Sequence, residues 1–311
     1  MTIAAAFWRR KFLHLKPSSP RLFETEPETK VRADCHWQDA PREHPTLLLL
    51  HGLEGSSDSG YMLGTADKAL HAGFNVLRVN QRNCGGTEDL TPTLYNSGLS
   101  CDMRAVVSEL IERDELPEIF AAGFSMGGNL VLKMAGEWGE SAPRELRAVA
   151  GICPSCNLGA CADAIGELRN RVYERHFVRR LKRRMIDKAK LFPRKYPLNG
   201  LAKIRSVREF DDAITAKFCG FRDADDYYTR SSALGLLAEL RVPTLILAAQ
   251  DDPMIPFHSF GAEKLAANPR ITLEAPSHGG HCAFIATKRI GERFWAEARI
   301  VEFCRAHSRI K

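Results

Sequence analysis

The sequence predicts an α/β fold in which a mostly parallel central sheet carries helices on both faces. Short apolar runs that end in turn residues indicate buried strands, and helical patterns lie between most of these runs. Strands that alternate with helices form parallel sheets, because each crossover helix packs back onto one face of the sheet. The length of 311 residues suits one large domain or two small ones.

Strand and helix patterns follow one another along most of the chain. The predicted strands are Thr46–Leu50, Phe74–Val79, Ile119–Ala122, Val149–Ile152, Pro243–Ala249 and Ile271–Leu273. The predicted helices are Thr65–Ala72, Asp102–Arg113 and Asn129–Gly136.

The alternation stops between about Pro154 and Tyr228, where charged residues are frequent and strand signals are few. We expect helices here, inserted between two strands of the sheet. Over the C-terminal ends of the strands, such an insertion would form a lid. The predicted organisation is therefore an N-terminal surface segment at 1–30 and a main domain at 31–311, with the lid insertion at about 154–228.

Composition indicates an ordinary globular protein, with 44% hydrophobic and 26% charged residues. No apolar run approaches the roughly 20 residues that cross a bilayer. The N-terminus is a poor secretory signal, because its apolar stretch is short and basic residues follow it. The nine cysteines are scattered and odd in number, which favours a reducing cytoplasm over a disulfide framework.

The net charge of +6 comes from one segment. Residues 167–190 hold ten Lys and Arg against three Asp and Glu, which leaves the rest of the chain close to neutral. This distribution argues against a nucleic-acid groove. Within the segment, Phe177, Leu181 and Met185 are spaced as one face of a helix. The segment is interpreted as a lid helix with a solvated basic face, or as a peripheral contact with an anionic membrane surface.

The stretch GFSMGG, at 123–128, joins an apolar strand to a helical pattern. A serine at a sharp strand-to-helix turn is typical of a nucleophile elbow. The turn strains the serine backbone, and side chains at 123 and 127 would clash, so glycine suits both positions. The free N–H groups at the start of the helix would face the reaction centre. We therefore expect Ser125 to be a nucleophile.

Acidic residues and histidines also follow predicted strands. Asp251 and Asp252 come after one strand, and His278 and His281 come after the next. Ligands of open parallel sheets bind outside the C-terminal strand ends, so these side chains and Ser125 should meet there. The chain order Ser, Asp, His is that of one known arrangement of the serine hydrolase triad.

The chemistry accounts for these residue types. A serine hydroxyl needs an imidazole to take its proton during attack and to return it to the leaving group. An aspartate on the other ring nitrogen fixes the tautomer. The oxyanion needs donors already in place, and the backbone N–H groups of Leu53 and Met126 are the candidates.

The whole chain resembles the α/β-hydrolases, and in particular the group of bacterial YheT-type proteins, plant embryogenesis-associated proteins and yeast medium-chain ester synthase/esterases. The stretches that carry this resemblance are HGLEGSSDSGY (51–61), QRNCGGTE (81–88), YNSG (95–98), GFSMGGN (123–129), REFDDAIT (208–215), DDYYTRSSA (225–233), DDPMIP (251–256) and HGGHCAFI (278–285). The resemblance implies a serine hydrolase of carboxylic esters. One departure is the Gln-Arg-Asn-Cys-Gly run at 81–85, where relatives often have Arg-Gly-Cys.

The same resemblance selects among the candidate side chains. In the family, the catalytic acid is followed by any residue, an apolar residue, any residue and a proline. Asp252 fits this spacing, which leaves Asp251 to bond the loop backbone. The Gly-Gly-His pattern selects His281 as the base over His278. His51 is expected to hydrogen-bond within its own loop.

No cofactor or metal is expected. Cys153 and Cys156 form a C-x-x-C, but no second pair stands at zinc-ligand spacing, so a structural role is favoured. The expected partner is a small-molecule ester with a short- to medium-chain acyl group. Acyl transfer to an alcohol by the same triad is one alternative, and a non-catalytic ligand-binding protein on the same fold is another.

Overall fold

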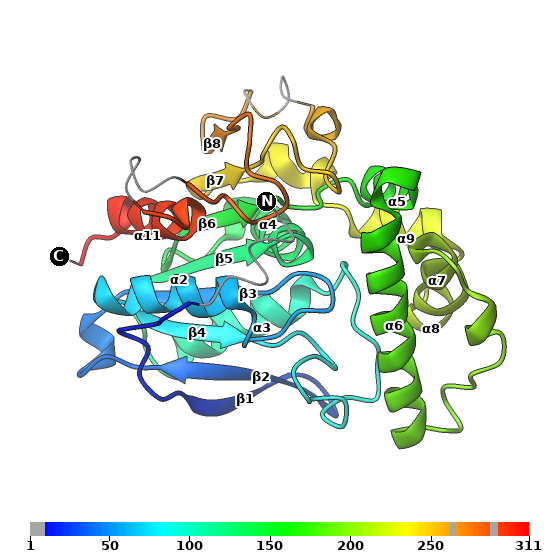
Figure 1. Cartoon of the computed structure of the whole chain (residues 1–311). Helices are drawn as coiled ribbons and strands as arrows, with labels where there is room; N and C mark the ends of the chain where they lie inside the picture. Colours follow the sequence, from blue (N-terminus) through cyan, green and yellow to red (C-terminus); the bar gives the residue numbers. More distant parts are fainter. Residues whose placement is uncertain (1–9, 262–264, 266, 287–291, 311) are drawn as a thin grey trace.

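The computed structural model describes residues 10–261, 265, 267–286 and 292–310 (Figure 1). Within these residues the fold is built on one eight-stranded sheet with the order β1-β2-β4-β3-β5-β6-β7-β8. β1 pairs antiparallel with β2 and β2 with β4, whereas the pairs from β4 through β8 are parallel. The strands are β1 Ser19–Glu26, β2 Thr29–His36, β3 Thr46–Leu50, β4 Asn75–Val79, β5 Ile119–Phe124, β6 Leu146–Ile152, β7 Thr244–Leu247 and β8 Ile271–Glu274.

Helices cover both faces of the sheet. In Figure 1, α2 and α11 lie in front of it, and α3 and α4 lie behind it. Every residue of β3, β4, β5 and β7 is buried between these layers. Burial on both faces explains why these strands are largely apolar in sequence, with Asn75 and Arg78 of β4 as exceptions. The four helices are α2 Gly60–His71, α3 Ser100–Glu112, α4 Met126–Trp138 and α11 Trp295–His307.

The six predicted strands are all present as β3 to β8, and the three predicted helices as α2, α3 and α4. β1 and β2 were not predicted, because β1 is mostly exposed, β2 alternates between buried and less buried residues, and neither contains a continuous apolar run. β1 falls inside the predicted N-terminal surface segment 1–30, where it pairs with β2 at the edge of the sheet. Residues 1–9 of that segment lie outside the described part of the chain.

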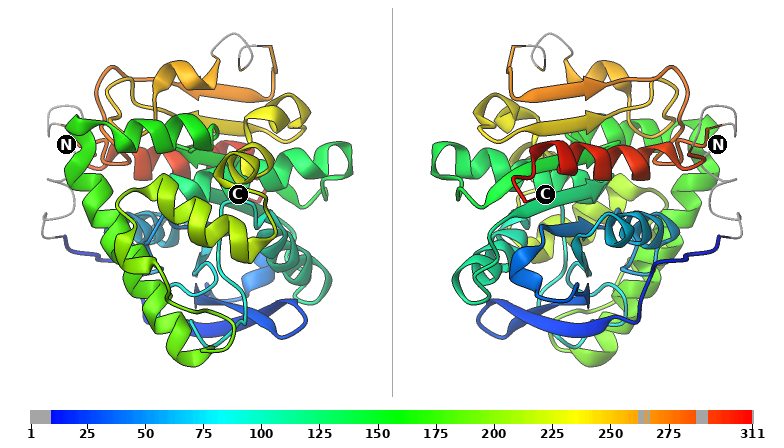
Figure 2. Two further views of the ribbon diagram at one scale, coloured as in Figure 1. Left: turned by 90° about the vertical axis from the view of Figure 1, so that its right-hand side faces the viewer. Right: turned by 90° about the vertical axis from the view of Figure 1, so that its left-hand side faces the viewer.

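Between β6 and β7 the chain forms a helical block beyond the C-terminal ends of the parallel strands (Figure 1). The left view in Figure 2 looks directly onto these helices. Buried side chains from this block, among them Val178, Met185 and Phe210, form an apolar cluster of their own. The block consists mainly of α5 Leu158–Gly166, α6 Arg171–Leu191, α7 Val207–Phe210, the π-helix η5 Asp211–Ala216, α8 Lys217–Cys219 and α9 Ala224–Ser231.

A buried ion pair between Arg82 and Asp102 holds the loop after β4 in place. Arg82 is 2% exposed, and its guanidinium donates to both carboxylate oxygens of Asp102 in α3, at 2.7 and 2.5 Å. A bidentate pair of this kind sets the position of both partners. Arg82 belongs to the stretch at which the sequence departs from the family pattern, and its contacts hold the loop to α3.

Among the described residues, none of the helices combines the length and the apolar character needed to cross a membrane.

Candidate active site

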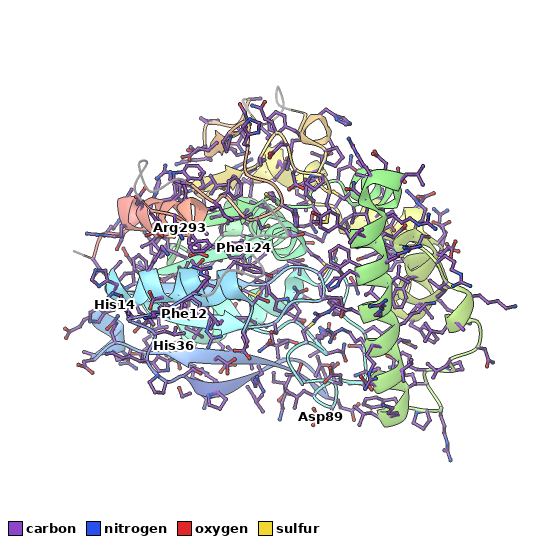
Figure 3. The ribbon with its side chains drawn as sticks, in the orientation of Figure 1. Phe12, His14, His36, Asp89, Phe124 and Arg293 are labelled. Carbon is purple, nitrogen blue, oxygen red and sulfur yellow. The ribbon has the colours of Figure 1, made fainter. Side chains whose placement is uncertain are left out.

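Ser125 occupies the turn between β5 and α4, directly after Phe124, the last residue of β5, which is labelled in Figure 3. Its backbone has φ 55° and ψ −117°, a conformation that is strained for a residue with a side chain. Backbone hydrogen bonds hold it there. The Ser125 N–H donates to the Ile152 carbonyl at 2.8 Å, and the Ser125 carbonyl accepts from Asn129 N–H at 3.1 Å.

The turn requires glycine at 123 and 127 because backbones pass very close to it. A Cβ at Gly123 would lie 2.1 Å from the Gly127 carbonyl oxygen, and one at Gly127 would lie 2.4 Å from the Leu50 carbonyl oxygen. Both distances are far inside van der Waals contact with backbone atoms, which cannot move aside. The structure therefore explains why the serine stands between two glycines in the sequence.

The loop after β3 brings Leu53 to the same place. Gly55 N–H donates to the Gly52 carbonyl at 3.0 Å and closes a tight turn around Leu53. A Cβ at Gly52 would lie 3.0 Å from the Ser125 Cβ, so this turn touches the serine. Met126 directly follows Ser125 as the first residue of α4, where the N–H groups of a helix have no intrahelical partner. Both predicted oxyanion residues therefore lie near Ser125 and line the same cavity.

Asp252 and His281 meet after β7 and β8. His281 Nδ1 lies 2.8 Å from Asp252 Oδ2, and the Asp252 side chain is 1% exposed. The other carboxylate oxygen of Asp252 accepts the N–H groups of Met254 and Ile255, at 2.9 and 3.1 Å. These two bonds orient the carboxylate towards the imidazole.

Charge controls the protonation of this pair. Burial opposes charge on His281, but the adjacent Asp252 carboxylate outweighs it and raises the pKa of the imidazole above its usual value. Burial acts to raise the pKa of Asp252, but the imidazole and the Met254 N–H together lower it. The pair therefore favours a charged carboxylate beside a basic imidazole.

The alternative candidates for the acid and the base, Asp251, His278 and His51, have other partners. Asp251 Oδ1 accepts the N–H groups of Gly279 and Gly280, both at 2.8 Å, and its other oxygen lies 3.3 Å from His278. Asp251 thus binds the backbone of the loop that carries His281. His51 is buried, its Nε2 accepts the Gln81 N–H at 3.1 Å, and its Nδ1 lies 2.8 Å from the Gly52 carbonyl. Burial lowers its pKa to about 4.

Ser125 and His281 line one cavity together with Leu53 and Met126. The helical block supplies most of the remaining wall, which is largely apolar. Its apolar contributors include Leu158, Cys161, Ala162, Ile165, Phe177 and Leu181. The cavity has a volume of about 80 Å³, well below the roughly 300 Å³ at which pockets for drug-sized ligands begin. A long substrate therefore needs part of this wall to move.

One interaction that the sequence patterns do not reveal ties α6 to the Leu53 turn. Arg184 donates to both oxygens of Glu54, at 2.7 and 3.0 Å, and the Glu54 side chain is 3% exposed. Tyr95 donates its hydroxyl to the same carboxylate at 2.6 Å, and Arg180 donates to the Glu54 backbone carbonyl at 2.7 Å. These partners come from distant parts of the chain, so no local signal could have identified them.

Among the described residues, Cys153, His281 and Cys282 form one group whose possible metal-ligating atoms lie within 4.8 Å of one another. The fit to a metal is poor. Burial raises the pKa of the Cys153 thiol well above its usual value, whereas metals bind the thiolate. The Nδ1 atom of His281 is also engaged with Asp252.

Comparison with known proteins gives matches over most of the chain. The Escherichia coli protein YheT, provisionally named an esterase, is 30% identical over 93% of this chain and 89% of its own length. Bovine phospholipase ABHD3 is 31% identical over 80% of this chain, and the Saccharomyces cerevisiae medium-chain fatty acid ethyl ester synthase/esterase 2 is 26% identical over 91%. This chain spans only 60% of the bovine protein and 66% of the yeast protein.

A solved structure of the Pyrococcus furiosus esterase Pf2001 superposes with a TM-score of 0.59 at 18% identity, over 93% of this chain and 92% of that one. At this identity the likeness shows the fold alone. The sequence profile described as the alpha/beta hydrolase fold matches residues 45–286. The match to YheT and the yeast protein confirms the resemblance found in the sequence, and the chain belongs to the α/β-hydrolase family.

Proposed function

We propose that the protein hydrolyses carboxylic esters through a catalytic triad of Ser125, His281 and Asp252. The observation that carries the proposal is that Ser125 and His281 line one cavity, while His281 Nδ1 lies 2.8 Å from the Asp252 carboxylate. The names of the relatives support ester hydrolysis, because they include an esterase, a phospholipase and an ester synthase/esterase.

The proposed reaction has two stages. His281 takes the Ser125 proton as the hydroxyl attacks the ester carbonyl, and the negative oxygen accepts the N–H groups of Leu53 and Met126. His281 then protonates the leaving alcohol, which leaves an acyl-enzyme on Ser125. Water attacks this intermediate in the second stage, again with His281 as base. Asp252 holds the imidazole in its tautomer throughout and stabilises the imidazolium.

Acyl transfer to an alcohol is the nearest alternative, because it differs only in what attacks the acyl-enzyme. The printed name of the yeast relative includes both ester synthesis and ester hydrolysis. Adding a medium-chain alcohol to the assay separates the two reactions. Formation of a new ester indicates a transferase, release of free acid alone indicates a hydrolase, and tight ligand binding without turnover indicates a non-catalytic protein.

The helical block at about 154–228 is proposed to act as a lid over this cavity. Phe177 and Leu181 of α6 line the cavity, and Leu181 and Met185 line a second cavity beside it, as the helical spacing of these residues indicated. Because the lining is apolar, it suits an acyl chain of short to medium length.

The outer face of α6 is proposed to contact an anionic membrane surface. Leu168 and Val172, near the start of the helix, are 86% and 69% exposed. Arg175 and Arg179 are exposed on the same face, and neither forms an ion pair with another described residue. Exposed apolar and basic side chains together match the chemistry of a lipid surface.

The nucleophile can be tested by covalent labelling. A fluorophosphonate probe should label the wild-type protein and fail to label Ser125→Ala, because only an activated serine reacts with it. Ser155→Ala is the matched control, since it removes another hydroxyl that lines the same cavity, and it should still be labelled. Labelling of Ser125→Ala would contradict the assignment of Ser125 as the nucleophile.

The acid can be tested through the pH profile. Since Asp252 raises the pKa of His281, and the base must be neutral to accept a proton, kcat/KM should rise with pH through a midpoint above about 6.5. Asp252→Asn should lower that midpoint and reduce kcat by up to about 10⁴-fold.

The matched comparison is Asp251→Asn, which removes the adjacent carboxylate and should lose far less activity than Asp252→Asn, because an amide oxygen can still accept the Gly279 and Gly280 N–H groups. If Asp251→Asn were the severely impaired variant and Asp252→Asn nearly normal, the two assignments would be exchanged.

The lid can be tested with p-nitrophenyl esters of increasing acyl length. Each buried methylene contributes about 0.8 kcal/mol, so four methylenes added to acetate should raise kcat/KM by roughly two orders of magnitude. Phe177→Ala should flatten this profile, whereas Val172→Ala, on the exposed face of the same helix, should leave it unchanged. A flat wild-type profile would contradict the proposed pocket.

Membrane contact can be tested with vesicles. Hydrolysis of an ester carried in anionic vesicles should fall as salt increases, because surface attraction is screened within about 10 Å at 0.1 M. The double variant Arg175→Gln/Arg179→Gln should lose this salt response, whereas Arg194→Gln, an exposed arginine beyond α6, should keep it. An equal salt response for a water-soluble ester would count against membrane contact.

A further inference from the structure

The turn that carries Leu53 contains a charged residue in an unusual backbone conformation. Glu54 has φ 56°, a left-handed value that residues with a side chain rarely adopt. The Gly52 carbonyl accepts the Gly55 N–H at 3.0 Å, which places Glu54 third in a tight turn. Turns with a positive φ at this position usually have glycine there. A glutamate is therefore strained here, and contacts of its side chain have to offset the strain.

The contacts that hold Glu54 come largely from helix α6. Arg184 donates to both oxygens of the Glu54 carboxylate, at 2.7 and 3.0 Å, and the Tyr95 hydroxyl donates to Oε1 at 2.6 Å. Burial and the adjacent Glu54 charge raise the pKa of Tyr95 well above its usual value, so its hydroxyl stays a donor. Arg180, one turn earlier in α6, donates to the Glu54 backbone carbonyl at 2.7 Å. Two arginines of one helix thus hold both the side chain and the backbone of one turn residue.

The N–H group next to this anchor is available to a ligand. Leu53 directly precedes Glu54, and no described residue accepts a hydrogen bond from the Leu53 N–H. Leu53 also lines the cavity that contains Ser125 and His281. An oxyanion donor is effective only at about 2.7–3.1 Å from the position that the negative oxygen will occupy. Because a tight turn moves as a unit, the anchor on Glu54 helps to set where the Leu53 N–H points.

Helix α6 is also fixed at a point that does not involve this turn. Lys188, one turn after Arg184, is fully buried and donates to the Glu88 carbonyl at 2.6 Å and to the Thr91 carbonyl. Attachment of the helix therefore does not in itself require a charged group on the Leu53 turn. The two buried cations of α6 form a natural comparison, because only Arg184 contacts Glu54.

We propose that Arg184 is a positioning residue for the proposed oxyanion site, because by binding Glu54 it holds the Leu53 N–H in place for the negative oxygen. Helix α6 then has two functions, since it also supplies part of the apolar wall through Phe177 and Leu181. Hydrolysis requires α6 to stay in place while the substrate reacts. This inference rests on the proposed ester hydrolysis and makes its oxyanion site depend on a side chain 130 residues away from Glu54.

The test compares Arg184→Gln with the wild type on p-nitrophenyl acetate and p-nitrophenyl octanoate. A displaced donor loses its bond to the negative oxygen, which exists in the transition state and not in the bound ester. We therefore expect kcat to fall by about 10- to 100-fold while KM stays near the wild-type value. The factor should be the same for both esters, because both form the same oxyanion. Arg184→Lys, which can form one of the two bonds, should recover part of kcat.

A trifluoromethyl ketone with an octyl chain measures the same site by binding. The Ser125 hydroxyl adds across its carbonyl, the proton passes to His281, and the carbonyl oxygen becomes negative. Its inhibition constant should rise in Arg184→Gln by the factor by which kcat/KM falls. The matched control is Lys188→Met, which removes the other buried cation of α6 and should leave kcat and this inhibition constant near their wild-type values, whatever its effect on Tm.

Three results would overturn the inference while leaving ester hydrolysis in place: an unchanged kcat in folded Arg184→Gln, a loss confined to the octanoate, or an equal loss in Lys188→Met. A loss confined to the octanoate would assign Arg184 to the acyl wall instead. Should Arg184→Gln fail to fold, Arg184→Lys decides the question, since its smaller loss should still be equal for the two esters and an unchanged kcat would contradict the proposal. Absence of hydrolysis of either ester by the wild type would instead refute the proposed function itself.

Discussion

The strained backbone at Ser125 constrains much of the surrounding structure. Conformations of this kind cost of order 1–3 kcal/mol and persist only where neighbouring contacts fix them. Asn129, one turn further along α4, supplies many of these contacts: its side chain donates to the Ser97 and Ser231 carbonyls at 3.0 and 2.9 Å and accepts the Ala233 N–H at 2.8 Å. One amide thus joins the elbow to loops that are more than 30 and 100 residues away in sequence.

The buried ion pair between Arg184 and Glu54 connects the helical block to the sheet in a second way. Burying two charges gains little stability in itself, but removing one partner leaves the other unpaired, at a cost of about 3–5 kcal/mol. Glu54 directly follows Leu53, so this pair also holds the turn that would bind the oxyanion. Stability of the helical block and geometry beside Ser125 therefore depend on the same side chains.

Local sequence patterns were sufficient for the strands from β3 onward, because each contains a short, largely apolar run with turn residues after it. They also indicated Ser125 in its glycine-rich stretch and two candidate histidines, His278 and His281, between which the family's Gly-Gly-His pattern decided. The choice between Asp251 and Asp252 needed the family spacing, since adjacent residues differ only in the direction they face. β1 and β2 lack an apolar run, and the contact of Arg184 with Glu54 joins distant parts of the chain, which periodicity does not encode.

Helix α6 is fastened towards both ends. Asn170, at its start, donates to the Pro253 carbonyl at 2.6 Å, beside Asp252, and Lys188 near its end donates to the Glu88 carbonyl at 2.6 Å. With the Arg184 pair between these points, α6 is held to the rest of the fold at three places along its length. The opposite wall is held partly by exposed ion pairs of Arg208, each worth about 0–1 kcal/mol. The outer ion pairs of this wall are therefore weaker than the buried contacts of α6, so we expect displacement of α7 to α9 to need less energy.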